Sequence, residues 1–120
     1  MLINRAGSMS FKNLEVWKRS ARLSAQLYRF TADLRDFGFR DQITRSGLSV
    51  ASNIAEAYGR GGRKEIAQFL RYARGSAAEL ETQIYVGIEA GYIQREQGKV
   101  WANESTELQA MLSGLLKTLN

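Results

Sequence analysis

Helical periodicity without a single proline constrains the fold of this 120-residue chain more than any other feature. Proline interrupts helix interiors, so its absence allows every long segment to continue as a helix. Apolar residues recur at the three- and four-residue spacing of an amphipathic helix in four segments. The pattern is interrupted around residues 36–39, 59–63 and 91–95. We therefore predict four helices joined by three short loops.

The predicted helices begin and end at residues that favour helix termini. Asn13 is a good N-cap for a first helix that continues to about Arg35, and the fourth helix is expected from about Arg95. Gly91 suits the left-handed position that ends the third helix. Short loops force neighbouring helices to be antiparallel. The predicted fold class is all-α, an antiparallel up-down-up-down four-helix bundle, with residues 11–120 forming a single domain.

The residue types on which most enzymes depend are missing. The chain has no Cys and no His, which excludes disulfides, thiolate or histidine metal sites and histidine-based catalytic triads. No run of about 18 apolar residues could span a membrane, and residues 1–10 lack a secretory signal. We predict a cytoplasmic protein with no enzymatic activity and no cofactor. Residues 1–10 are expected to be a disordered lead-in, with Met9 as an alternative natural start.

Positive charge is concentrated in the first half of the chain. Residues 1–64 hold 12 basic and 5 acidic side chains, whereas residues 65–120 hold 5 and 7, for a net charge of +5. A positive sector attracts phosphate backbones or acidic protein surfaces. The candidate nucleic-acid-binding residues are eight of the basic side chains of this half: Lys18, Arg19, Arg22, Arg29, Arg40, Arg60, Arg63 and Lys64. The alternative is a scaffold that docks an acidic protein partner.

The first predicted helix carries apolar residues on two nearly opposite sides. One set is Leu14, Trp17, Ala21, Ala25, Tyr28 and Ala32. The other set is Val16, Leu23, Leu27, Phe30 and Leu34. One bundle core covers only one such stripe, and a contiguous exposed apolar patch usually marks an interface. We assign the second set to an interface between copies of the chain and predict a homo-oligomer.

The second and third predicted helices carry small polar side chains on their outer faces. Ser and Asn weaken helix interiors unless they have hydrogen-bond partners. We therefore predict a hydrogen-bonded seam, between helices or between subunits, made of Gln42, Arg45, Ser49, Asn53, Glu56, Ser76 and Glu79. A solvated face of weak helix formers is the alternative. Arg74 and Glu81 at the edge of the third helix's apolar face are expected to form an ion pair.

A set of motifs is distributed over residues 11–119. They are Phe11-x-x-Leu14-x-Val16-Trp17, Gln42-Ile43-x-Arg45, Ser49, Asn53-Ile54-Ala55-Glu56, Gly59-Arg60 and Ala73-x-Gly75-Ser76-x-x-Glu79-Leu80. This pattern resembles the four-helix-bundle family encoded in intervening sequences of bacterial large-subunit rRNA genes. The chain departs from it in lacking a Pro between the first two helices and in having Ala57 where a Gly is common.

The resemblance implies homopentamers of antiparallel bundles around a central channel. It also implies kinship with accessory proteins of diversity-generating retroelements, which bind nucleic acid and a reverse transcriptase through a basic surface. It implies no known enzymatic activity. Residues and resemblance together predict a non-enzymatic ring, pentameric in the first instance, that binds RNA or DNA.

Overall fold

The chain is built from four long helices and one short helical turn. The computed structural model describes residues 10–119, so the lead-in predicted for residues 1–10 lies outside the described part except for Ser10. The elements are the 3-10 turn η1 (Phe11–Asn13) and the helices α1 (Glu15–Thr31), α2 (Phe37–Arg60), α3 (Arg63–Glu89) and α4 (Arg95–Lys117). No strand occurs between residues 10 and 119. The predicted all-α, four-helix fold is therefore confirmed.

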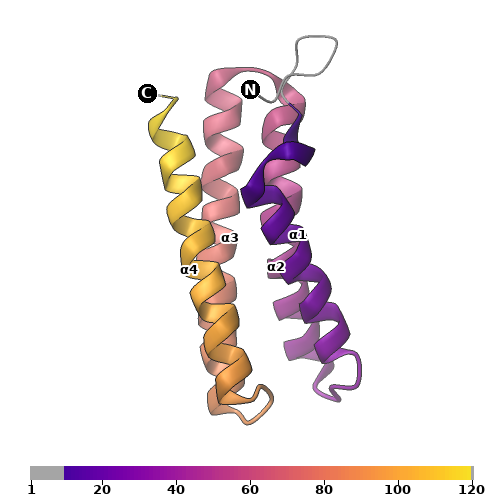
Figure 1. Cartoon of the computed structure of the whole chain (residues 1–120). Coiled ribbons are helices and arrows are strands. Elements are labelled where there is room, and N and C mark those ends of the chain that lie inside the picture. The colour runs from indigo at the N-terminus through magenta and orange to yellow at the C-terminus, as the bar shows by residue number, and fades with distance from the viewer. Residues whose placement is uncertain (1–9, 120) are drawn as a thin grey trace.

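Consecutive helices run in opposite directions and form an elongated bundle (Figure 1). Its extents are 47 × 23 × 21 Å, and the start of α1 and the end of α4 lie at the same end of the bundle. The backbones of α2 and α3 approach one another most extensively, followed by α3 with α4 and α1 with α2, whereas α1 and α4 approach one another least. The bundle is thus more open along the seam between its first and last helices. None of the described helices is long and apolar enough to cross a membrane.

The helix ends differ in part from those expected from the sequence. Asn13 lies in η1, and Leu14 takes the N-cap position of α1 without a side-chain hydrogen bond, so the predicted Asn13 cap is wrong. Helix α1 ends at Thr31, about one turn before the expected position. Gly61 and Gly91 have φ values of 90° and 80°, a conformation that glycine adopts more readily than other residues. Gly61 ends α2, and Gly91 reverses the chain after α3.

Asp36 fastens two loops together at one end of the bundle. Its carboxylate caps α2 by accepting a hydrogen bond from the backbone N–H of Phe39 at 3.0 Å. The Tyr92 hydroxyl, from the loop between α3 and α4, donates to the same carboxylate at 2.8 Å. The hydrogen bonds from Phe39 and Tyr92 hold the pKa of Asp36 below its ordinary value. The connection between α1 and α2 is therefore tied to the connection between α3 and α4.

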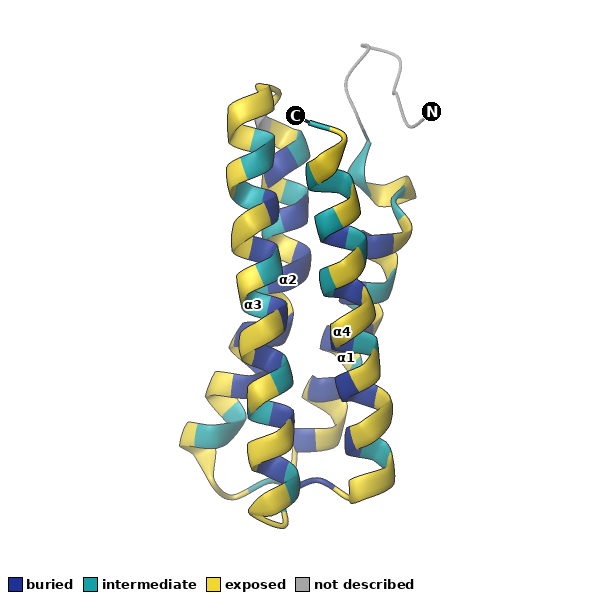
Figure 2. Cartoon of the chain, turned by 90° about the vertical axis from the view of Figure 1, so that its left-hand side faces the viewer, coloured by how far each residue is buried: buried dark blue, intermediate teal, exposed yellow. Residues whose placement is uncertain are grey.

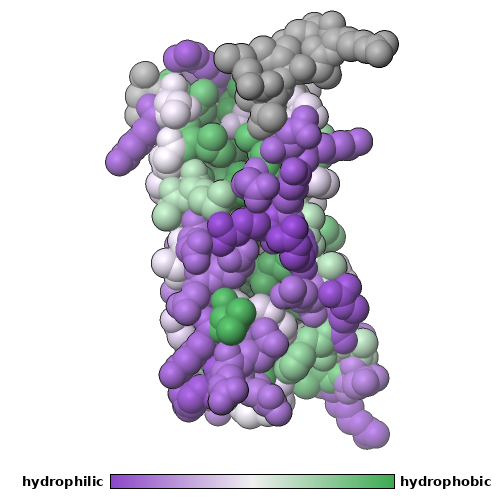
Figure 3. All heavy atoms as spheres, in the orientation of Figure 1, coloured by the Kyte–Doolittle hydropathy of each residue, from purple (hydrophilic) through white to green (hydrophobic). Residues whose placement is uncertain are grey.

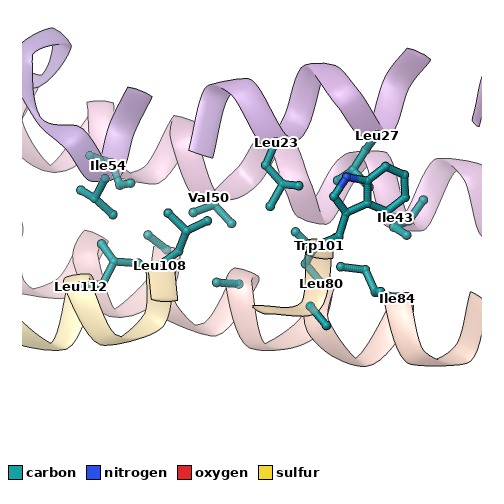
Figure 4. Packing of buried hydrophobic residues seen from close by; sticks show 14 of the residues in the cluster. Leu23, Leu27, Ile43, Val50, Ile54, Leu80, Ile84, Trp101, Leu108 and Leu112 are labelled. Atoms are coloured by element: carbon teal, nitrogen blue, oxygen red, sulfur yellow. The ribbon is translucent and has the colours of Figure 1, made fainter. Parts of the chain in front are cut away.

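All four helices carry buried positions on their inner sides (Figure 2), and the apolar side chains at these positions form one core cluster. Figure 4 labels ten of these side chains pointing into the interior: Leu23, Leu27, Ile43, Val50, Ile54, Leu80, Ile84, Trp101, Leu108 and Leu112. Trp101 is the only tryptophan among the buried described residues, and its indole N–H donates to the Gln26 side chain at 3.1 Å. Gly47 lets α1 and α2 come close, because a Cβ atom there would lie 2.6 Å from Leu27.

Candidate nucleic-acid interface and polar seam

The polar faces of α2 and α3 meet in a hydrogen-bonded seam within one chain. The Asn53 amide donates to the carbonyl oxygen and to the hydroxyl oxygen of Ser49, at 2.9 Å each. The Ser49 hydroxyl lies 2.9 Å from the Ser76 hydroxyl of α3. One turn away, the Ser46 hydroxyl donates to the Glu79 carboxylate at 3.4 Å. Small polar residues that would weaken a solvated helix thus have partners that join α2 to α3.

A shallow cavity of about 250 Å³ opens beside this seam. Its lining consists of Gln42, Arg45, Ser46, Ser49, Glu79 and Gln83. The Gln83 Oε1 atom is buried without a hydrogen-bond partner among the described residues. Gln42, Arg45 and Glu56 of the predicted seam are exposed on α2, and Gln42 and Arg45 share this lining with Ser49. Glu79 is the one carboxylate in this lining, which leaves no second carboxylate there for acid–base catalysis by a pair.

Arg19 forms an ion-pair network that closes the open side of the bundle. Its guanidinium donates to both oxygens of Glu104 on α4, at 2.8 and 2.5 Å, and to Glu107 at 2.8 Å. Both carboxylates raise the pKa of Arg19, and the hydrogen bonds from Arg19 lower the pKa of Glu104. Hydrophilic side chains cross the middle of this face of the bundle in Figure 3, with hydrophobic patches above and below them. Because two carboxylates neutralise it, Arg19 has to be removed from the predicted nucleic-acid surface.

The remaining predicted basic residues do not form one continuous patch. Arg40 and Arg60 are 20 positions apart in α2, which corresponds to about 30 Å along the helix. Arg40 donates to the Ala32 carbonyl at 3.2 Å and lies over the Phe37 ring at 4.8 Å. Arg63 donates to the Leu119 carbonyl at 3.3 Å. The Arg60 side chain lies outside the described part of the structure.

Three of the predicted cations share the outer face of α1. Lys18, Arg22 and Arg29 are all exposed and fall within about 40° of one another around the helix axis. Lys18 lies 3.9 Å from Glu15, at the limit of an ion pair between exposed groups. Lys64 is likewise exposed but lies in the first turn of α3, outside this face of α1. The α1 strip, defined as Lys18, Arg22 and Arg29, is the largest coherent part of the predicted surface.

The expected oligomer interface on α1 has to be corrected. Val16, Leu23 and Leu27 are 2%, 3% and 0% exposed, so they form the core of a single chain and cannot contact a second copy. Phe30 remains 42% exposed and meets Trp101 edge-to-face at 4.9 Å, and Leu34 is half-buried in the following loop. The apolar stripe left on the surface of α1 is the other one, in which Ala25, Tyr28 and Ala32 are exposed and Leu14, Trp17 and Ala21 half-buried.

A family model described as "23S rRNA-intervening sequence protein" matches residues 12–114. The chain belongs to this family. One solved structure matches with a TM-score of 0.79 and 31% sequence identity, and the alignment covers 85% of this chain and 98% of the other. It is the crystal structure of a protein of unknown function from the S23 ribosomal protein family of Bacteroides thetaiotaomicron VPI-5482. A search of curated proteins found no match.

The family match includes the polar seam, the Arg19 network and the α1 strip. It ends before Lys117, the last residue of α4. Sequence reasoning missed Glu104 and Glu107 as partners of Arg19, because they lie 85 and 88 positions away and no spacing rule links them. Their three-residue separation places both on one side of α4, which is the signal that could have indicated a shared cationic partner.

Proposed function

We propose that this member of the 23S rRNA-intervening sequence protein family is a non-enzymatic, self-associating helical bundle that binds nucleic acid through its basic surface. The observation that carries the proposal is the α1 strip, three exposed cations on one side of one helix. Lys18, Arg22 and Arg29 span 11 positions, about 16 Å of helix, and phosphates of one strand recur every 3.4 Å along a duplex. The strip therefore matches the length of a short run of phosphates.

Self-association would multiply these contacts by repeating the strip in each copy. We propose a ring, with five copies as the number that the family resemblance implies. The surface that supports it is the outer side of α1 and α2, where Tyr28, Phe37 and Leu48 are 48%, 61% and 46% exposed. Phe37 and Leu48 are 11 positions apart and so lie on one side of α2. Burying these side chains between copies would remove apolar area from water.

The substitution Leu48→Arg tests the assembly without disturbing the monomer fold, because Leu48 is already exposed within a single chain. We expect light scattering to show an oligomer for the native chain and a smaller species for L48R at micromolar concentration. Val100→Arg is the matched control, because Val100 is 62% exposed on α4, outside the proposed interface. A monomeric native chain, or equal dissociation by V100R, would refute the proposed interface.

Nucleic-acid binding is tested with a labelled duplex of about 25 base pairs at 50–100 mM salt. We expect the native chain to bind and the K18Q/R22Q/R29Q variant to bind more weakly, while circular dichroism shows that both are folded. An acidic protein partner is the competing function, since the same cations would attract carboxylates. Two results together would favour a protein partner and contradict nucleic-acid binding. One is an acidic protein that is captured by the chain even after nuclease treatment, and the other is no binding to the duplex at 50 mM salt.

A further inference from the structure

A second cationic surface lies between α3 and α4, in the half of the chain whose net charge is negative. It is a groove of about 390 Å³ lined by Ala67, Arg71, Arg74, Ser113, Leu116 and Lys117. Three of these six residues are basic, and none is acidic. We infer that this groove, called the α3–α4 groove below, is a binding site for the phosphate backbone of a nucleic-acid duplex. The inference deepens the proposed function and rests on it.

Arg74 is held in place at the floor of the groove. Its Nη1 donates to the Ser113 hydroxyl at 3.1 Å, across the interface between α3 and α4. A guanidinium has five N–H donors in a fixed fork, so this one hydrogen bond leaves donors for phosphate oxygens. The Ser113 hydroxyl accepts from Arg74 and keeps its own proton to donate. Ordering the guanidinium before the ligand arrives lowers the entropy lost on binding.

The expected ion pair between Arg74 and Glu81 is not formed. Glu81 accepts a hydrogen bond from the Gln109 amide at 2.7 Å, and Arg74 contacts Ser113 instead. The two side chains are seven positions apart, about 10 Å along α3. No salt bridge between described residues involves Arg71, Arg74 or Lys117. The positive charge of the groove is therefore available to a ligand.

Arg63 extends the cationic groove toward the start of α3. Helical geometry places Arg63, Arg71 and Arg74 within about 80° of one another, on the side of α3 that faces α4. Arg63 contacts the Leu119 carbonyl, which confirms that this side lies next to the end of α4. From Arg63 to Arg74 the helix rises about 16 Å, the length of four or five phosphates in one strand of a duplex. Figure 2 faces this side of the bundle, where exposed positions run along both helices.

The composition of the groove favours a duplex over single-stranded nucleic acid. Proteins that hold single strands stack bases on aromatic side chains in addition to binding phosphates. The six residues that line the α3–α4 groove include no aromatic side chain. They also present Arg, Lys and Ser to the ligand, which are the side chains that contact phosphates without reading sequence. We expect binding that tolerates any sequence and weakens as salt rises.

The inference is tested with the full-length R71Q/K117Q variant. Both side chains are exposed, so the fold should survive, as circular dichroism would check. R95Q/K99Q is the matched control, because it removes two exposed charges at the opposite end of α4. The probes are fluorescein-labelled DNA and RNA duplexes of about 25 base pairs and a single strand of the same length, titrated by anisotropy from 50 to 200 mM salt.

Each phosphate contact with a duplex strengthens binding at 100 mM salt roughly eightfold relative to 1 M salt. Loss of two contacts should therefore weaken duplex binding by R71Q/K117Q roughly 60-fold and make the slope of log K against log salt shallower by about 1.8. The control should lose less than about threefold. If the native chain binds duplex and R71Q/K117Q loses no more than R95Q/K99Q, the groove is misassigned but the proposed function stands.

Two further outcomes would also overturn the assignment. If the native chain binds neither duplex at 50 mM salt, the proposed function and the groove assignment both fail. If R71Q/K117Q loses affinity for the single strand but not for either duplex, the ligand class is wrong. Tighter binding of one duplex than of the other by the native chain, with both weakened in R71Q/K117Q, would identify the duplex that the groove prefers and would support the inference.

Discussion

The Arg19–Glu104 pair makes a specific prediction about what closes the bundle between α1 and α4. The side chains of Arg19 and Glu104 are 25% and 26% exposed, and they form two parallel hydrogen bonds. An exposed ion pair contributes about 0.2–1 kcal/mol, and charge-assisted bidentate hydrogen bonds contribute more. With Glu107 retained as a second partner, we expect a coupling free energy of about 1–2 kcal/mol between Arg19 and Glu104.

A double-mutant cycle measures this coupling directly. The native chain, R19M, E104Q and the double variant would be unfolded with urea at one protein concentration, since the proposed self-association would make stability depend on concentration. Each single variant should lower the unfolding free energy, and the double variant should cost less than the sum of the two. A loss of 1 kcal/mol would lower the melting temperature by roughly 3–6 °C for a chain of this size.

The coupling between Arg19 and Glu104 should depend on pH, because it needs the charged form of Glu104. The pKa of Glu104 is lower in the folded chain than its ordinary value, so its charged form is favoured by folding. The stabilisation is complete above the unfolded pKa of about 4.3 and is lost as pH falls through the lower folded value. The coupling should therefore be present at about pH 7 and diminished near pH 3. A coupling below about 0.3 kcal/mol at neutral pH, or one that is unchanged in acid, would refute the reasoning.

Two further substitutions test the packing of the helices. Gly98→Ala should destabilise the fold by about 1–2 kcal/mol, because a Cβ atom at Gly98 would lie 2.3 Å from the Ile88 side chain. This cost should exceed the gain from the higher helix propensity of Ala. A G98A protein that is more stable in urea unfolding would contradict the prediction. Ser49→Ala should cost about 1 kcal/mol by removing the hydroxyl that links α2 to Ser76, whereas Ser52→Ala, on the exposed side of the same helix, should be neutral or slightly stabilising. Equal effects of S49A and S52A on the unfolding free energy would show that the seam adds no stability.

The four helices could be predicted from the sequence because their signals are local. The three breaks coincide with the observed loops to within a few residues, and Gly91 ends the third helix as expected. The orientation of α1 could not be predicted from periodicity, since both of its stripes are apolar. The structure buries Leu23 and Leu27 and leaves Ala25 and Ala32 exposed, an orientation that depends on packing against the other helices.

The partners of the charged residues were beyond local reasoning. Arg19 lay in the basic half of the chain and was grouped with the other cations, but its carboxylate partners come from α4. The α3–α4 groove could not be predicted because its cations lie outside the basic half of the chain. Arg71, Arg74 and Lys117 lie in a half with net negative charge, and only the packing of α3 against α4 brings Lys117 together with the two arginines. Charge averaged along a sequence hides charge that the fold concentrates in space.

The salt dependence of duplex binding by the native chain tests the proposed function most directly. Three cations of the α1 strip or three of the α3–α4 groove would each neutralise a phosphate, so the slope of log K against log salt should be about −2.7 or steeper for each copy bound. The measurement is an anisotropy titration of the labelled duplex at several salt concentrations on a preparation of defined oligomeric state. A slope near zero, or no binding at 50 mM salt, would contradict nucleic-acid binding through a basic surface.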